Sequence, residues 1–239
     1  MENEIISAGK YEIPILYEDN HLLVVVKPAN VPSQPDPSKD PDMLTLLKDY
    51  IARKYNKPGN VYLGLVHRLD RPVGGVMVFA RTSKAASRLS EAFREHVQDR
   101  RYLAVCEGEF SGETELNDLL LKVKSTGNVR VVTEDEPGAK AARLITRPIA
   151  SRNGLTLTEA QLFTGRSHQI RVQHAHFGHP LWGDMRYGHG EPGRQIALWA
   201  WKLTFEHPTK HEPVSFTARP PKNGAWADFD EDIERHLEE

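Results

Sequence analysis

The length, composition and charge of the chain exclude several classes of protein. With 239 residues, 39% of them hydrophobic, the chain is long enough to bury a core, and its single cysteine excludes a disulfide-stabilised scaffold. No apolar run approaches the ~20 residues of a membrane span, and the N-terminal residues contain no apolar signal core. We therefore expect a soluble protein of the reducing cytoplasm.

The formal net charge of −2 conceals an uneven distribution. Residues 222–239 contain seven acidic and two basic residues, which leaves the remaining chain with a charge of +3. A mildly basic body with an acidic tail is compatible with a nucleic-acid partner but does not require one.

The first part of the chain predicts two strands, an ordered loop and a helix. Residues 13–28 (IPILYEDNHLLVVVKP) predict strands joined at Asp19 and Asn20, and the prolines that follow predict the loop. Asp40 can cap the helix, with Pro41 at its first position. One face of this helix carries the apolar residues Met43, Leu47, Tyr50 and Ile51.

Two short apolar runs, residues 61–66 and 75–80, predict strands on either side of a charged segment. Ser83 can cap a helix after the second run. Its apolar stripe consists of Ala85, Leu89, Ala92, Phe93 and Val97. A strand follows over residues 100–110, where we expect Cys106 to be a small buried side chain and not a reactive thiol.

The second half of the chain predicts more strands and one helix. The strands are expected over residues 128–134, 141–149, 155–163, 196–208 and 213–218, and the helix over residues 167–178. Strand runs interrupted by a few helices indicate the α+β class, with a large mixed or antiparallel sheet. No linker divides the chain, so we expect one domain over residues 1–221.

The acidic residues 222–239 predict a helix that docks on this domain. Its apolar residues at helical spacing are Trp226, Phe229, Ile233 and Leu237. An apolar stripe needs a surface to cover, which favours docking over the alternative of a regulatory or partner-binding tail.

The stretch "GLVHRLDRPVGGVMVFART", residues 64–82, places charged residues between two predicted strands. A carboxylate at a strand end, beside Pro72 and two glycines, lies on a turn that the scaffold fixes, which is a common position for a reactive group. Asp70 is therefore a candidate catalytic residue. The alternative is a structural Asp70 that pairs with Arg68 or accepts backbone hydrogen bonds in the turn.

A second polar stretch, "FTGRSHQIRVQHAHFGHPLWGD", covers residues 163–184. Basic side chains crowd a loop at the start of the predicted helix, which Ser167 can cap. The N-terminal amides of this helix and the side chains of Arg166, His168 and Arg171 suit a phosphate or another anion.

A metal site is not predicted in this stretch. Four histidines are close in sequence, but His174 and His176 stand two apart on a helix and point to different faces. No cysteine and no HExxH-type pair accompanies them. The glycine spacing also excludes a P-loop or dinucleotide-binding fingerprint.

The chain resembles the RluA-type family of RNA pseudouridine synthases. The resemblance runs from about Ile15 to Pro221 in four blocks that occur in the family's order: "ILYEDNHLLVVVKPANVPSQP", "VHRLDRPVGGVMVFART", "RRYLAVCEG" and "TGRSHQIRVQHAHFGHPLWGD". It implies a catalytic domain whose large mixed or antiparallel sheet is flanked by helices and loops around a central cleft. The implied activity is a cofactor-free isomerase without a metal, which breaks the C1′–N1 bond of a uridine in RNA, turns the uracil and rejoins it through C5.

The resemblance also implies roles for individual residues. Asp70 matches the family's catalytic aspartate, Tyr102 the tyrosine that packs on the uracil, and Arg171 the arginine that pairs with the aspartate. RNA binding and base flipping are expected from Arg68, His67, Arg166, His168 and Gln169. Phosphate contacts are expected from Arg81, Lys84, Arg88, Arg166 and Arg186.

The resemblance predicts RNA as the partner, either ribosomal or transfer RNA, and a monomer. The small S4-type RNA-binding domain of many relatives is not expected, so the catalytic domain itself must recognise the RNA. Two alternatives stay open. One is a non-catalytic RNA-binding protein or RNA chaperone, and the other is a glycoside or nucleoside hydrolase that uses Asp70 with a second carboxylate such as Asp184.

Overall fold

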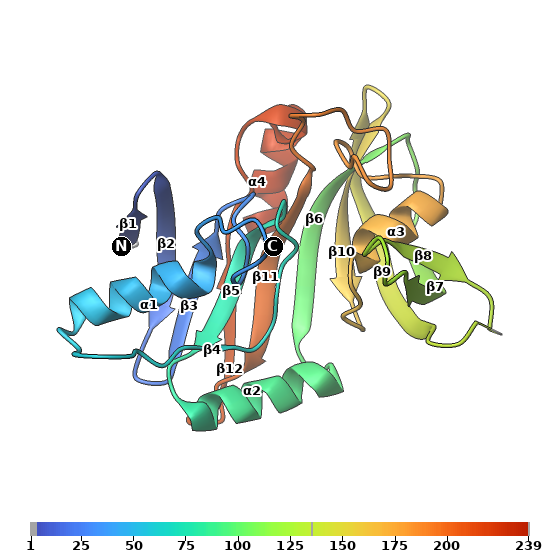
Figure 1. Cartoon of the computed structure of the whole chain (residues 1–239). Coiled ribbons are helices and arrows are strands. Elements are labelled where there is room, and N and C mark those ends of the chain that lie inside the picture. Colours follow the sequence, from blue (N-terminus) through green and yellow to red (C-terminus); the bar gives the residue numbers. More distant parts are fainter. Residues whose placement is uncertain (1–3, 135, 239) are drawn as a thin grey trace. The chain divides into compact units, whose positions relative to one another are not determined.

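The computed structural model describes residues 4–134 and 136–238 and confirms the α+β class (Figure 1). Contacts divide the chain into two units. Unit one contains the residues up to Gln98 together with Ala200–Ala218, and unit two contains Asp99–Trp199 and the residues from Arg219 onward. These boundaries do not coincide with the division at residue 221 that the sequence predicted. Of the helices in the described residues, none combines the length and apolarity that a membrane span requires.

Unit one is a sheet with two helices. Its strand order is β1 (Ile5–Ala8), β2 (Tyr11–Glu18), β3 (Leu22–Lys27), β5 (Gly74–Ala80) and β11 (Leu198–Glu206), whose first two residues belong to unit two. Strand β4 (Gly64–Leu65) pairs with β5 and β12 (Pro213–Thr217) with β11. The helices are α1 (Met43–Lys54) and α2 (Ser83–Glu95). Asp19 joins β2 to β3 as predicted, because its carboxylate accepts the N–H groups of His21 and Leu22 at 2.7 Å.

The core of unit one forms where α2 packs on β4 and β5. All seven residues of β5 are buried, so this strand is a continuous apolar run instead of an alternating one. Leu89 and Phe93 of α2 join the core as predicted. Val97 does not: the helix ends at Glu95, His96 takes the left-handed conformation, and Val97 is 69% exposed.

The predicted helix caps are wrong by one or two residues. Asp42, not Asp40, caps α1 by accepting the Thr45 N–H at 3.1 Å. Thr82, not Ser83, caps α2 by accepting the Ala85 N–H at 3.2 Å. Both caps have the expected chemistry, but neighbouring residues of similar chemistry compete for each position.

Unit two is an antiparallel sheet with helices of its own. Its strand order is β6 (Asp99–Glu107), β10 (Leu155–Leu162), β9 (Lys140–Arg152), β7 (Thr114–Lys122) and β8 (Val129–Val132). Helix α3 (Gln169–His176) contacts β7 and β8. The sequence did not predict β7, nor β1 of unit one. Cys106 is fully buried in β6, and burial raises the pKa of its thiol, as expected for a packing residue.

The acidic C-terminal residues dock on unit two. A short 3₁₀ helix η1 (Gly224–Phe229) leads into α4 (Asp230–Glu238), which contacts β9. Trp226, Phe229 and Ile233 are buried. Arg152 of β9 lies over the Phe229 ring and forms an ion pair with Asp232. The apolar stripe therefore covers a surface, and acidic side chains of the helix bind arginines of unit two.

Gly75 provides a test of the packing in unit one. Its φ is +120°, and a Cβ atom there would lie 2.2 Å from the Ala200 carbonyl oxygen. Gly75→Ala should lower the free energy of unfolding by about 3 kcal/mol or more, from backbone strain and overpacking together. Gly9→Ala is the matched control, because Gly9 has φ +64° and no atom within 4 Å of such a Cβ, and it should cost about 1 kcal/mol. If urea unfolding showed that the two variants lose equal free energy of unfolding, the packing argument would be contradicted.

Candidate active site

Asp70 lies in a turn between β4 and β5. The Val73 N–H donates to the Asp70 carbonyl at 3.0 Å, which closes the turn. Leu69 is buried, Asp70 is half-buried and Arg68 is exposed. The turn thus anchors one apolar side chain inside the unit and leaves the charged residues near solvent.

A buried serine fixes the residue before Asp70. The Ser33 hydroxyl donates to the Leu69 carbonyl at 2.8 Å and accepts the Leu69 N–H at 3.2 Å. Ser33 is only 5% exposed and comes from the proline-rich loop that the sequence predicted to be ordered. Both backbone groups of Leu69 are therefore bound by one side chain, which limits the motion of its neighbour Asp70.

The residue after Asp70 is fixed by a buried lysine and by the same loop. Lys27, at the end of β3, donates from Nζ to the carbonyls of Arg71 and Pro28 at 3.0 Å each. The Arg71 guanidinium binds the carboxylate of Asp40 and lies 3.7 Å from that of Asp36. Burial lowers the pKa of Lys27 to about 7, while Asp70 acts to raise it and Arg71 to lower it.

Sequence analysis missed Lys27 as a candidate site residue. A lysine at a strand end is usually exposed, and only the contiguous "VVVKP" run indicated that this one continues a buried strand.

His67 is held by the scaffold of unit one. Its Nε2 accepts the Val78 N–H at 3.0 Å, and its ring stacks on Phe93 of α2 with centroids 4.6 Å apart. Arg68 follows directly and is exposed. The arginine predicted to assist base flipping therefore starts from a fixed backbone.

In unit two, Gln169 organises the loop before α3. Its side-chain oxygen accepts the Arg166 N–H and the Thr164 hydroxyl at 2.9 Å each, and its Nε2 donates to the Arg143 carbonyl at 3.1 Å. Gln169 is 3% exposed. Its amide group is thus committed to the loop, and Gln169 fixes the backbone that carries Arg166.

The predicted cap of α3 is wrong. His168, not Ser167, is the N-cap residue; it has a left-handed backbone and makes no side-chain cap hydrogen bond. Its Nδ1 instead lies 2.7 Å from the Tyr187 hydroxyl, which accepts the Val129 N–H. His168 is therefore tied to two further segments of unit two.

Arg171 forms a two-pronged ion pair with Asp184 inside unit two. Its Nε and Nη2 each lie 2.7 Å from a different oxygen of the carboxylate, and both side chains are buried. Burial alone would raise the pKa of Asp184, but the hydrogen bonds from Arg171 and from the amides of Arg186 and Tyr187 outweigh it and lower the pKa. Both oxygens of the Asp184 carboxylate are therefore bound by Arg171, which argues against Asp184 as the second carboxylate of a hydrolase.

Tyr102 lies on β6 opposite Ala160 of β10 and is partly exposed. Arg100, two residues before it, is 9% exposed, and a Cβ atom on Gly165 would lie 2.6 Å from its Nη1. Burial lowers the pKa of Arg100, Tyr102 acts to raise it and Arg166 to lower it. Arg100 is thus a second charged residue that sequence analysis missed; the repeated arginine in "RRY" was its signal.

The predicted site residues are divided between the two units. Unit one contains His67, Arg68 and Asp70, and unit two contains Tyr102, Arg166, His168, Gln169 and Arg171.

The histidines that are close in sequence are used in the fold. His174 is fully buried between the Ile170 carbonyl and the Thr146 hydroxyl, and burial lowers its pKa to about 4. His179 lies 3.0 Å from the Glu107 carbonyl. Within residues 4–134 and 136–238, no three His, Cys, Asp or Glu side chains are grouped to hold a metal ion.

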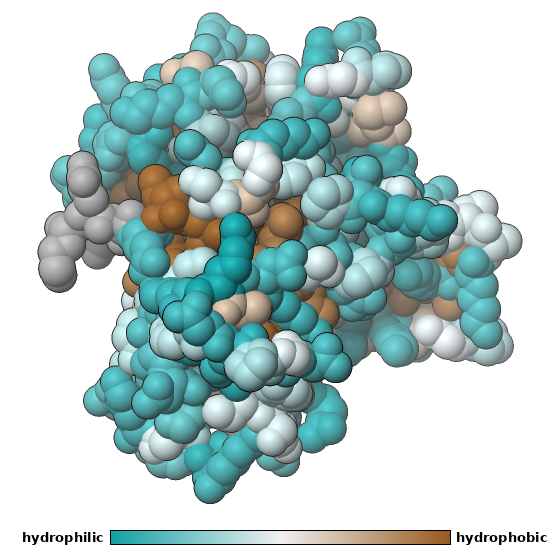
Figure 2. All heavy atoms as spheres, turned by 60° about the vertical axis from the view of Figure 1, so that its left-hand side comes forward, coloured by the Kyte–Doolittle hydropathy of each residue, from teal (hydrophilic) through white to brown (hydrophobic). Residues whose placement is uncertain are grey.

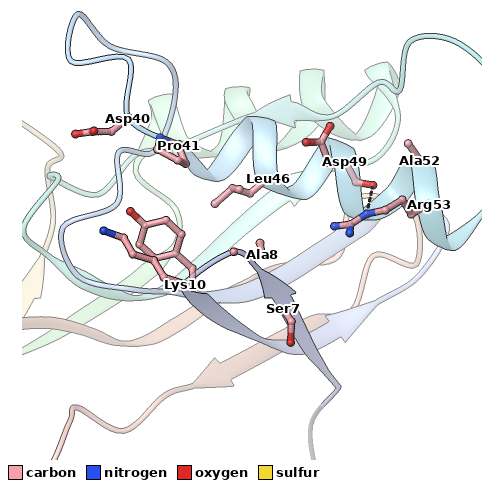
Figure 3. A pocket seen from close by; sticks show the side chains of 11 residues that line it. Ser7, Ala8, Lys10, Asp40, Pro41, Leu46, Asp49, Ala52 and Arg53 are labelled. Atoms are coloured by element: carbon pink, nitrogen blue, oxygen red, sulfur yellow. Dashed lines mark hydrogen bonds between the residues drawn. The ribbon is translucent and has the colours of Figure 1, made fainter.

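A pocket of about 970 Å³ lies in unit one between the β1–β2 turn and α1 (Figure 3). Its lining combines apolar side chains, such as Leu46, with the charged side chains of Lys10, Asp49 and Arg53. The side of the molecule that carries β1 and α1 is mainly hydrophilic, with hydrophobic side chains gathered in one area (Figure 2). None of the predicted site residues lines this pocket.

Comparison with known proteins gives consistent matches. The sequence profile of a family described as RNA pseudouridylate synthase matches residues 21–176. Ribosomal large subunit pseudouridine synthase D of Zymomonas mobilis is 32% identical over 223 residues, covering 88% of this chain and 70% of that protein. The tRNA pseudouridine synthase C of Vibrio parahaemolyticus is 30% identical over 230 residues, covering 87% and 90%. The solved structure of Human RNA Pseudouridylate Synthase Domain Containing 4 has a TM-score of 0.72 over 92% of both chains at 22% identity, a likeness in fold.

The Arg171–Asp184 pair makes a stability prediction. Asp184→Asn should lower the free energy of unfolding by about 3–5 kcal/mol at pH 7, because it removes the charged partner that binds the buried guanidinium at two points. Since the folded pKa of Asp184 lies below the ordinary 3.8, this stabilisation is present above that pH and is lost as the pH falls through the folded pKa. Urea unfolding of both proteins at several pH values measures the difference.

The control for this measurement is Glu113→Gln. It removes an exposed ion pair with Arg147 in the same unit and should cost about 1 kcal/mol or less. A cost for Asp184→Asn no larger than that of the control would contradict the buried pair's role.

Proposed function

Because the chain belongs to the RNA pseudouridylate synthase family and is thus an RNA pseudouridine synthase, we propose that it isomerises specific uridines of structured ribosomal or transfer RNA with Asp70 as the catalytic carboxylate. The observation that carries this assignment is the turn of Asp70, whose two neighbouring residues are bound by the buried side chains of Ser33 and Lys27. A binding protein has little use for a carboxylate fixed in this way beside a phosphate chain. This argues against a non-catalytic RNA-binding protein or chaperone.

The reaction needs positioned charge but no oxidant or reductant. The C1′–N1 bond breaks with its electron pair on the uracil, the C1′–C5 bond forms, and the proton of C5 leaves while N1 gains one. The sugar develops positive charge as the C1′–N1 bond breaks. As a nucleophile, the carboxylate forms a bond to C1′ that breaks when C5 attacks; as a base, it takes the C2′ proton and returns it when the C1′–C5 bond forms. Asp70 serves in both forms of the mechanism.

Residues of both units have roles in this proposal. The target uridine must leave its stack, which costs a few kcal/mol, and the exposed Arg68 beside the fixed His67 is suited to occupy the vacated place. Tyr102 offers an aromatic face to the uracil. Arg166 and His168 are suited to the phosphates beside the uridine.

Asp70→Asn tests the catalytic assignment. The amide keeps the shape of the carboxylate but loses its charge and basicity, so the rate should fall by about 1,000-fold or more while RNA affinity stays within about two-fold. Ribosomal and transfer RNA transcripts labelled with tritium at C5 of uridine report the reaction, because isomerisation releases that hydrogen. Mapping pseudouridines in cells with and without the protein identifies the RNA.

Asp49→Asn is the control, since Asp49 is exposed on α1 and lies outside the predicted site. The Asp49→Asn variant should isomerise uridine at the wild-type rate. Wild-type rates for Asp70→Asn would refute the role of Asp70, and release of free uracil would indicate a hydrolase instead.

Arg166→Gln tests the phosphate contacts. Log affinity should fall linearly with log salt, at about −0.7 per phosphate contacted on single-stranded RNA, so this variant should lower the slope by about 0.7 without changing which uridine is modified. Arg235→Gln is the control, because Arg235 is a highly exposed residue of α4 that is assigned no contact with RNA. An unchanged slope for Arg166→Gln would mean that Arg166 serves the loop, where its Nε binds the Ala141 carbonyl, and not the RNA.

A further inference from the structure

Lys27 ends strand β3 with an ammonium group that is closed off from solvent. Its exposed fraction is 0%, and its Nζ donates to two backbone carbonyls, those of Pro28 and Arg71. Carbonyl oxygens solvate an ammonium group but do not cancel its charge, and an uncompensated buried charge is strongly unfavourable. The site therefore needs a carboxylate close to Lys27.

The charged groups around Lys27 identify that carboxylate as Asp70. The turn contributes Asp70, whose charge favours the protonated lysine, and Arg71, whose charge opposes it. Strand β5 places Gly75 opposite Lys27 and adds no charge. The proline-rich loop contributes Asp36 and Asp40, but these bind the guanidinium of Arg71.

We propose that Lys27 is a positioning residue for the reaction of Asp70. Its buried ammonium group binds the backbone carbonyl of Arg71, the residue after Asp70, and places a positive charge near the catalytic carboxylate. This inference rests on the proposed function of Asp70. Lys27 acts from inside unit one and does not touch the RNA, because its side chain is closed to solvent.

Variants of Lys27 and Ser33 distinguish the effect of a nearby charge on the reaction from the effect of a fixed backbone. Both fix a residue next to Asp70, but Ser33 does so with a neutral hydroxyl. Lys27→Met keeps an unbranched apolar chain of similar length and removes the charge, whereas Ser33→Ala removes hydrogen bonds only. Lys10→Met is the control, because Lys10 is an exposed lysine on the β1–β2 turn.

The test is tritium release from C5-labelled RNA, with kcat and KM measured for each variant. Lys27→Met should lower kcat by about 100-fold and change KM by less than about three-fold, as expected for a fixed charge that acts on the reacting group. Ser33→Ala should lower kcat less, and Lys10→Met should leave both constants unchanged. A kcat for Lys27→Met within two-fold of wild type would overturn the proposal.

The pH profile distinguishes this role from a purely structural one. Because the pKa of Lys27 is about 7, the ammonium form is lost as the pH rises through neutrality, and the wild-type kcat should fall on that side. This fall in kcat above neutral pH should persist in Ser33→Ala and disappear in Lys27→Met. A fall of equal size in Lys27→Met would overturn the proposal.

A measurement without activity separates this proposal from the proposed function. Lys27 is protonated in the unfolded chain up to about pH 10.5 but only to about pH 7 in the fold, so wild type should gain stability relative to Lys27→Met as the pH rises between these values. Asp70→Asn removes the negative charge that favours protonated Lys27, which lowers the pKa of Lys27 in the fold further. In proteins that carry Asp70→Asn, the gain in stability over Lys27→Met should therefore begin at a lower pH. An unchanged onset would overturn the pairing of Lys27 with Asp70. Full activity of Asp70→Asn with a shifted onset would instead refute the catalytic role of Asp70, and with it the positioning role of Lys27, and would leave only the electrostatic pairing of Lys27 with Asp70.

Discussion

The backbone around Asp70 is fixed from inside unit one by two side chains that are distant in sequence. Ser33 binds both backbone groups of Leu69, and Lys27 binds the carbonyl of Arg71. These contacts require an ordered proline-rich loop, and α1 supplies that order, because the Met43 N–H donates to the Pro32 carbonyl at 2.8 Å. The hairpin of β2 and β3, the loop and α1 thus form one support for a single carboxylate. A catalyst that relies on fixed charge requires such a support before the RNA arrives.

Unit two applies the same principle to a longer loop. Gln169 binds the backbone of the segment before α3, and Asp184 compensates the charge of Arg171 and accepts two amides. The side chains of Gln169 and Asp184 thus bind backbone groups of unit two on either side of α3. Little reorganisation is left for the moment of reaction, which is the main electrostatic advantage of a folded site over water.

Much of the fold could be predicted from the sequence, because apolar runs of strand length are bounded by turn residues. Strand β5 and the strands of the second half follow this pattern, but β7 (TELNDLLLK) mixes acidic and apolar residues without alternation and was missed. Helix caps were displaced, since adjacent Asp, Ser and Thr residues are equally suited by chemistry. The turn that carries Asp70 was predicted from its sequence and is present, while the catalytic role that the family motif gives Asp70 stays a prediction. Lys27 could not be predicted, because burial of a lysine depends on tertiary packing that no local pattern reveals.

The same tertiary contacts decide which cations remain for RNA. Arg81 was expected to contact phosphate, but its side chain is 9% exposed and pairs with Glu18 at 2.9 Å. Arg88 donates to the Pro208 carbonyl, and Arg152 and Arg219 bind acidic residues of α4. A charge of +3 on the body therefore overstates the field that a phosphate chain meets, because Arg152 and Arg219 are paired with acidic residues of the tail. Cations that the fold already binds, such as Arg81 and Arg88, are thus poorly placed for the phosphate contacts predicted for them, and exposed cations outside these contacts are better suited.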